Sequence, residues 1–313
     1  MISLNNVTKR YGGRTVVNDV TFTAPAGQVT AFLGPNGAGK STSMRILAGL
    51  SRADSGTALV GGRAVAELPN PGRVVGLMLD ASALHRGRTC AETVRLAAMA
   101  TGVGPQRARE ALKAVGLSAA AGKRVAACSL GMRQRLGLAV ALVGRPRALV
   151  LDEPFNGLDP EAIQELRGVL RDFAAVGGAV LLSSHLLNEV QTVADHLVVL
   201  HAGTVVASGP AAELTAAGRT RVRAERSADL RQALVSGGIE VMADDGDWLT
   251  VAAPPGQVGR LALHAGIALT GLEERRTDLT DLFLNLTSAG SGGMPPERRG
   301  ATSAEPPRTA RAA

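Results

Sequence analysis

The 313-residue sequence has few aromatic side chains and no long apolar run. Aromatic residues make up 2% of the chain while hydrophobic residues make up 45%, so a core must be built mainly from Val, Leu, Ile and Ala. That hydrophobic fraction excludes a wholly disordered chain. No run approaches the ~18 apolar residues of a membrane helix, and the N-terminal MISLNNVTKRYGG has no apolar signal segment. We therefore expect a chain that neither spans a membrane nor is exported by a signal peptide.

Cysteines are also scarce, and the basic residues are not clustered. Cys90 and Cys128 lack the spacing of a metal motif, and one pair in so long a chain indicates reduced thiols in the cytosol rather than a disulfide framework. The net charge is +7, but Lys and Arg are scattered and few aromatics are available to stack on bases. We expect no nucleic-acid partner.

Short apolar runs alternate with helical patterns up to about residue 213. The runs are VTAFLG (29–34), ALVLDE (148–153), AVLLSS (179–184) and HLVVLH (196–201). This alternation predicts an α/β layer structure with buried, largely parallel strands. Ala202-Gly203 and the following TVVASG predict a hairpin, and so an antiparallel edge.

The pattern of predicted strands and helices changes from about Arg219. Residues 219–287 read as strand, helix, strand, helix and strand, which predicts a small α+β module with helices on one sheet face. Residues 288–313 are rich in Gly, Pro, Ser and charge, which predicts a disordered tail.

A phosphate-binding loop is the strongest motif. Residues 34–41, GPNGAGKS, fit G-x-x-x-x-G-K-[ST] between an apolar run and a helical pattern. Inward N–H groups and the positive helix end favour phosphate, while Lys40 should reach the β- and γ-phosphates and Ser41 should bind Mg²⁺. The predicted ATP-binding residues are Gly34, Pro35, Asn36, Gly37, Ala38, Gly39, Lys40, Ser41 and Thr42.

Two further apolar runs end in candidate catalytic residues. ALVLDEP delivers Asp152, the predicted Mg²⁺ partner, and Glu153, the predicted general base for attack on the γ-phosphate. AVLLSSH ends at His185, which should emerge at the same sheet edge and contact the γ-phosphate. The remaining histidines have no such context.

The stretch CSLGMRQR, residues 128–135, reads as a helix start. Ser129 can cap the helix, and apolar positions follow at Leu136, Leu138 and Leu142. From these residues alone the helix either fills the core or also holds a ligand against its N-terminal amides.

Together, GPNGAGKST, CSLGMRQR, LVLDEP, NGLDP and SSH resemble, in order and spacing, the nucleotide-binding subunits of ATP-binding cassette (ABC) transporters over residues 1 to about 213. The resemblance implies a P-loop ATPase fold with a mixed core sheet, an antiparallel β subdomain and a helical subdomain at about 80–145. It implies ATP and Mg²⁺ as cofactors.

The resemblance also implies roles for single residues. Tyr11 matches the aromatic that stacks on adenine, and Asp159 matches the loop that couples two ATP sites. Ser129 and Gly131 match positions that bind the γ-phosphate of ATP held by a second subunit, which implies a head-to-tail homodimer or pseudo-dimer. Asp80 stands where the family usually has a glutamine that contacts Mg²⁺, and we expect it to share that role.

Two features favour one group within this family. Leu130 and Met132 depart from the usual glycine and glutamine, and this variant resembles exporters with separately encoded permeases. The module at 219–287, ending in TDLTDLFLNLT, resembles the extension of drug, antibiotic and polysaccharide exporters. Helical spacing predicts core or dimer contacts for its last apolar residues, Leu279, Leu282, Phe283 and Leu286.

We therefore expect an ATP-hydrolysing subunit that powers export of a drug, antibiotic or lipid-like compound through a separate membrane permease, bound peripherally at the cytoplasmic face. The main alternative is a soluble ABC ATPase of DNA repair, ribosomes or mechanical signalling. The double cassettes, coiled coils or zinc modules of that class are not visible here. A nucleotide-dependent binding switch with little turnover is a weaker alternative, because Glu153 is present.

Overall fold

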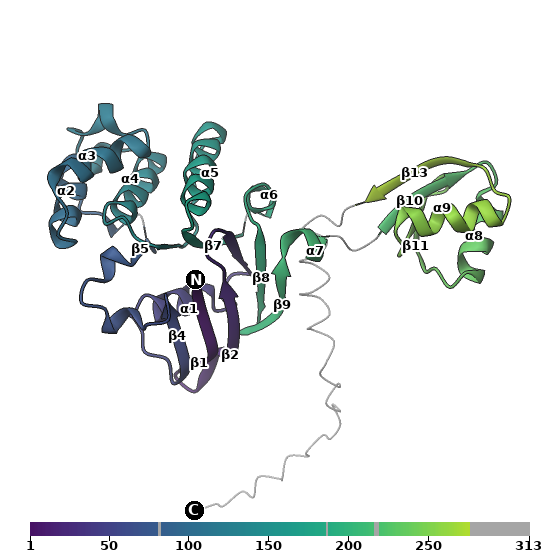
Figure 1. The fold of residues 1–313 in the computed structure, drawn as a ribbon, viewed down its shortest axis with the longest axis horizontal. Helices are drawn as coiled ribbons and strands as arrows, with labels where there is room; N and C mark the ends of the chain where they lie inside the picture. Colours follow the sequence, from purple (N-terminus) through teal and green to yellow (C-terminus); the bar gives the residue numbers. More distant parts are fainter. Residues whose placement is uncertain (81–82, 186, 216–218, 276–313) are drawn as a thin grey trace, which may run out of the picture.

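The computed structural model describes residues 1–80, 83–185, 187–215 and 219–275, and the strands in these ranges form three sheets (Figure 1). A three-stranded antiparallel sheet contains β1 (Ile2–Tyr11), β2 (Arg14–Ala24) and β4 (Ser55–Val60), in the order β2-β1-β4. Ile2, Leu4 and Val7 of β1 are buried, and they belong to one core cluster with Phe32 and Met44 of the nucleotide-binding region. This packing attaches the antiparallel sheet to the central sheet.

The central sheet has the order β5-β6-β7-β3-β8-β9. Its strands are β3 (Val29–Leu33), β5 (Val75–Met78), β6 (Ala148–Leu151), β7 (Ala179–Ser184), β8 (His196–His201) and β9 (Thr204–Pro210). The first five are parallel and β9 is antiparallel. Every residue of β3, β6 and β7 is buried, as expected for parallel strands covered on both faces.

The hairpin expected at Ala202-Gly203 is present. Both residues have positive φ, 46° and 85°, which suits the tight turns that join antiparallel strands. It gives the parallel sheet the antiparallel edge that the sequence predicts, and the mixed-sheet fold is confirmed.

Helices surround the central sheet, and α2, α3 and α4 form a group of their own (Figure 1). The α-helices of this part are α1 (Lys40–Leu47), α2 (Cys90–Ala100), α3 (Pro105–Ala114), α4 (Leu130–Leu142), α5 (Pro160–Ala175), α6 (Leu187–Gln191) and α7 (Ala211–Thr215). Short 3-10 turns are η1 (Val65–Glu67), η2 (Pro71–Arg73), η4 (Ser118–Ala120) and η5 (Val125–Ala127). A capping box begins α2, because the Thr89 hydroxyl accepts from the Glu92 N–H and the Glu92 carboxylate accepts from the Thr89 N–H. None of the helices in the described ranges has the length and apolarity needed to cross a membrane.

The C-terminal module is built around a four-stranded antiparallel sheet of order β11-β12-β10-β13. Its elements are β10 (Arg219–Ala224), α8 (Ser227–Ser236), β11 (Val241–Asp244), β12 (Leu249–Val251), α9 (Pro255–His264) and β13 (Leu269–Arg275). Val222, Leu230, Leu249 and Val258 belong to its separate buried cluster. The sequence did not predict β11, which is short and mostly exposed and so lacks an apolar pattern. The predicted tail and the apolar residues 279–286 lie outside the described residues.

Candidate nucleotide-binding site

The phosphate-binding loop connects the end of β3 to α1, and two of its glycines have no space for a side chain. A Cβ on Gly34 would lie 2.4 Å from the Leu200 carbonyl oxygen. Gly39 has a φ of 107°, and a Cβ there would lie 2.7 Å from the Val16 carbonyl oxygen. The loop can therefore take its tight path only because these positions are glycine.

Lys40 is buried at the first position of α1. Its Nζ donates to the carbonyl oxygens of Gly34, at 2.6 Å, and Pro35, at 3.3 Å. Burial lowers the pKa of Lys40 below its ordinary value, while the nearby carboxylates of Glu153 and Asp152 raise that pKa and oppose the shift. The loop thus holds a cation whose present partners are neutral carbonyls, which anionic phosphate oxygens can replace.

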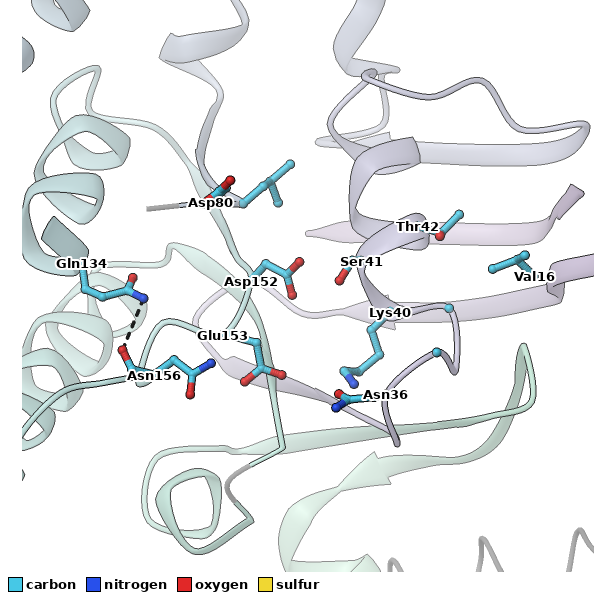
Figure 2. A pocket seen from close by; sticks show the side chains of 13 residues that line it. Val16, Asn36, Lys40, Ser41, Thr42, Asp80, Gln134, Asp152, Glu153 and Asn156 are labelled. Atoms are coloured by element: carbon cyan, nitrogen blue, oxygen red, sulfur yellow. Dashed lines mark hydrogen bonds between the residues drawn. The ribbon is translucent and has the colours of Figure 1, made fainter. Parts of the chain in front are cut away.

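A cavity of about 370 Å³ opens between this loop and the strand ends of the central sheet (Figure 2). Its lining residues are Val16, Asn36, Gly37, Gly39, Lys40, Ser41, Thr42, Leu79, Asp80, Gln134, Asp152, Glu153 and Asn156. Most of the predicted phosphate and metal residues are therefore brought together. Gly34, Pro35 and Ala38 do not line the cavity, and they shape the loop behind it.

Asp152 and Glu153 follow β6, and the neighbouring strand β7 fixes both. The Ser183 hydroxyl donates to Asp152 Oδ1 at 2.5 Å and accepts from the Glu153 N–H at 2.9 Å. Glu153 has a φ of 50°, an unusual backbone conformation for a residue other than glycine. Ser183 therefore holds Asp152 directly and stabilises the turn that presents Glu153.

His185, directly after β7, contacts Glu153. Its Nδ1 lies 2.8 Å from Glu153 Oε2, and its backbone N–H donates to the same oxygen at 3.4 Å. The expected meeting of His185 and Asp152 at one sheet edge is thus observed, although the direct partner of His185 is Glu153. His185 therefore fixes one oxygen of the carboxylate, while Glu153 lines the cavity.

Asp80 lies beside Asp152 because their strands are neighbours. The Asp152 N–H donates to the Met78 carbonyl oxygen at 2.7 Å, and both aspartates line the cavity with Ser41. Figure 2 shows the Ser41 hydroxyl and the Asp152 carboxylate facing the same space. Two carboxylates and a hydroxyl are oxygen donors of the kind that Mg²⁺ prefers, so the residues fit this ion.

Tyr11 does not line the cavity. It ends β1 with half of its surface exposed, its hydroxyl lies 3.1 Å from Ser51 Oγ, and the Lys9 ammonium lies 5.2 Å from the ring centroid. The ring is thus available to stack on a base.

Ser129, Gly131 and Asp159 also lie outside the cavity. The Ser129 hydroxyl caps α4 by accepting from the Met132 N–H at 3.2 Å, and the Asp159 carboxylate caps α5 by accepting from the Ala162 N–H at 2.8 Å. Within one chain these two side chains act as helix caps.

Gln134 and Asn156 line the cavity although the sequence analysis did not select them. Gln134 Nε2 donates to the Asn156 carbonyl oxygen at 3.4 Å, and its Oε1 is buried without a hydrogen-bond partner among the described residues. The available signal was position: Gln134 precedes the buried Leu138 by one helical turn, so it lies on the inward face of α4.

Comparisons with known proteins agree with this geometry. A family model described as ABC transporter matches residues 17–156. The lantibiotic transport ATP-binding protein SrtF of Streptococcus pyogenes is 38% identical over 206 residues, which are 66% of this chain and 89% of that protein. The chain belongs to the ABC transporter ATP-binding proteins. It is thus an ATP-binding, ATP-hydrolysing subunit of a transporter, as the motifs predict.

Other relatives of this ABC ATPase differ in how much of the chain they cover. The bacitracin transport ATP-binding protein BcrA of Enterococcus faecalis is 32% identical over 303 residues, 94% of this chain and 98% of that protein. The Fe(3+) ions import ATP-binding protein FbpC of Streptomyces avermitilis is 38% identical over 219 residues, 68% of this chain and 64% of its own length. A solved ATP-binding subunit of an ABC transporter is 32% identical, with a TM-score of 0.64, over 68% of this chain and 91% of that one.

Two further family models match parts of the ABC ATPase. Residues 124–190 match a model described as an AAA domain and putative AbiEii toxin, a shorter range that omits the phosphate-binding loop. Residues 218–279, which include the C-terminal module, match a domain of unknown function.

Proposed function

We propose that this ABC ATPase powers the export of an antibiotic, drug or lipid-like compound through a separate membrane permease. The observation that carries this proposal is the extent of similarity to bacitracin transport ATP-binding proteins, which covers 94% of the chain and so includes the C-terminal module. The iron import relative matches only 68% of the chain. Export thus has support from the module as well as from the cassette.

The proposed hydrolysis follows from the contacts in the cavity. The loop N–H groups and Lys40 hold the β- and γ-phosphates, and Glu153 Oε1 accepts a proton from the water that attacks the γ-phosphorus. His185 keeps Glu153 Oε2 in place, so that the free oxygen faces the water. When ATP leaves as ADP and phosphate, the bond broken is the one between the γ-phosphorus and its bridging oxygen.

Mg²⁺ is proposed as the second cofactor, held by Ser41 and Asp152 with Asp80 beside them. Among the described residues no group of three or more His, Cys, Asp or Glu gathers tightly enough to hold a metal alone. That agrees with an ion that takes most remaining ligands from phosphates and water. Mg²⁺ would neutralise charge that develops on the phosphate oxygens.

A homodimer is proposed because each chain has an unused anion-binding element. The N-terminal turn of α4 is outside the chain's own cavity, and it combines the positive end of the helix with the Ser129 hydroxyl and Gly131. In a head-to-tail pair this turn of one copy would contact the γ-phosphate in the other. We place the dimer at the cytoplasmic face of the membrane on its permease, without a nucleic-acid partner.

Reconstitution with a candidate permease of the same organism tests the export proposal. Inside-out vesicles containing both proteins should accumulate bacitracin or a related amphipathic compound only with ATP, and Glu153→Gln should abolish accumulation. Vesicles with the permease and the Glu153→Gln chain form the matched control. ATPase activity that responds to DNA or ribosomes but not to the permease would favour the soluble alternative.

A further inference from the structure

We call the cavity lined by Lys40 and Glu153 the ATP cavity. A second cavity, of about 880 Å³, lies at the opposite edge of the central sheet. Its lining includes Val74, Ala148 and Gly178, at the starts of β5, β6 and β7. The ATP cavity instead follows the ends of β5 and β6. Since these strands are parallel, the two cavities are separated by the length of the sheet.

Four arginines, Arg63, Arg73, Arg145 and Arg147, line this second cavity, and no aspartate or glutamate of the described ranges does. We call it the arginine cavity. Within the described ranges only Arg145 has a carboxylate within ion-pair distance, Glu110 Oε2 at 3.6 Å, while Arg63 donates to a backbone carbonyl. Three guanidinium groups therefore share one cavity without an acidic partner there, an arrangement that an anion would relieve.

Backbone hydrogen bonds fix the positions of these arginines. The Arg147 N–H donates to the Val74 carbonyl oxygen at 2.9 Å, and the Ala179 N–H donates to the Arg147 carbonyl oxygen at 3.0 Å. Arg73 ends η2, and its N–H donates to the Asn70 carbonyl oxygen at 3.2 Å. The backbone of Arg73 and Arg147 is thus fixed beside the sheet, while the side chains of all four arginines are exposed and can reach a ligand in the cavity.

Apolar residues line the rest of the arginine cavity, among them Leu68, Phe173 and Val176. A neighbouring cavity of about 470 Å³ shares Phe173, Val176 and Arg145, and adds Leu142 and Val169. Val176 is 85% exposed although it is apolar. Apolar side chains therefore adjoin the four arginines, and Glu110 and Asp172 also line the neighbouring cavity.

We propose that the arginine cavity binds a phosphorylated ligand with at least two negative charges and an apolar part. Guanidinium groups pair with phosphate through two parallel N–H···O bonds, and the volume is that of small-molecule sites, roughly 300–1,000 Å³. The phosphate lies among Arg63, Arg73 and Arg147, and the apolar part lies on Phe173 and Val176. A soluble phosphate ester and a lipid headgroup share this chemistry.

The test uses the Lys40→Ala variant, which removes phosphate binding at the loop. Any binding that remains can then be assigned to the arginine cavity. Tripolyphosphate should bind the full-length Lys40→Ala chain near a 1:1 ratio in calorimetry. Adding Arg73→Glu and Arg147→Glu should weaken binding at least about tenfold, because attraction becomes repulsion. The matched control adds Arg95→Glu and Arg260→Glu, two exposed arginines outside the cavity, and should change affinity less than about twofold.

Co-sedimentation with phosphatidic acid vesicles, against phosphatidylcholine vesicles, distinguishes the lipid source. Binding to phosphatidic acid that needs Arg73 and Arg147 supports a lipid headgroup, and arginine-dependent binding of tripolyphosphate alone supports a soluble ester. Arg73→Gln with Arg147→Gln, checked by thermal melting, covers the case in which the glutamates prevent folding. Equal loss in the control pair, or no binding of either probe, would overturn the proposal.

Discussion

At the scale of single residues, Glu153 is fixed from two strands. Its own strand brings it to φ 50°, Ser183 of β7 accepts its backbone N–H, and His185 contacts its Oε2. These contacts hold the carboxylate at the lining of the nucleotide cavity. General-base catalysis depends on such placement, since the base must lie within hydrogen-bond reach of the water.

Glu153→Gln should keep ATP affinity within about twofold of the native value and lower turnover at least about 100-fold, because only proton acceptance is lost. Fluorescent-nucleotide titration and phosphate release measure the two quantities. Lys40→Ala is the contrasting variant and should lose affinity itself, since Lys40 contacts the phosphates. Native-like turnover in Glu153→Gln would contradict the role of Glu153.

Ser183→Ala should destabilise the protein by about 1–3 kcal/mol, because the Glu153 N–H and Asp152 lose their shared partner. Urea unfolding measures this change, and turnover should fall with it as Asp152 and Glu153 lose their alignment. Ser43→Ala is the matched control, since the buried Ser43 hydroxyl donates only to the Gly39 carbonyl oxygen, which the Ser43 N–H already contacts. Equal destabilisation by both variants would show that Ser183 has no special role.

At the scale of elements, the sequence predicted those structures that a continuous stretch of residues determines. The phosphate-binding loop, the strands that carry Asp152 and His185, and the hairpin at residues 202–203 each have a continuous signal in the sequence. Gln134 and Asn156 escaped prediction because their place at the cavity depends on how α4 packs against the loop after β6. The arginine cavity escaped it because its four arginines come from segments far apart in the sequence.

Two thiols lie side by side, Cys90 at the start of α2 and Cys128 two residues before α4. Cys90 Sγ and Cys128 Sγ are 3.6 Å apart, both buried and both free, in line with the expected reduced thiols. Burial, and then the hydrogen bond with Cys128, raises the pKa of Cys90 from 9.0 to about 11. The neutral thiol is thus the form compatible with this junction.

The raised pKa of Cys90 predicts that the free energy of unfolding falls between about pH 9 and about pH 11. A raised pKa in the folded state means that the contribution of Cys90 is complete below about pH 9 and is lost as pH rises toward about 11. Urea unfolding at pH 8 and pH 10.5 should show a larger loss for the native chain than for Cys90→Ala, in which the other alkaline titrations remain. Equal losses of stability in both proteins would show that groups other than Cys90 cause the alkaline destabilisation.

At the scale of the whole molecule, the residues proposed to bind one ATP molecule lie at two separate places in the chain. Lys40 and Glu153 line the cavity, whereas Ser129 lies at the start of α4, outside it. The C-terminal module has its own buried cluster, and none of its described residues lines the cavity. In the proposed head-to-tail dimer, a second copy brings the start of its α4 to this cavity without rearranging the fold.

Two inactive variants should therefore restore each other. Ser129→Arg blocks the site that a chain completes in its partner, and Lys40→Ala blocks the site that it holds itself. In a mixed head-to-tail dimer one site then combines an intact Lys40 with an intact Ser129, while the other site lacks both. An equal mixture should recover up to about a quarter of native turnover, because half of the dimers are mixed and one of their two sites works. Ser129→Ala is the milder control, which removes the hydroxyl but adds no bulk. If phosphate release stays at background at every mixing ratio, the start of α4 does not act across a dimer.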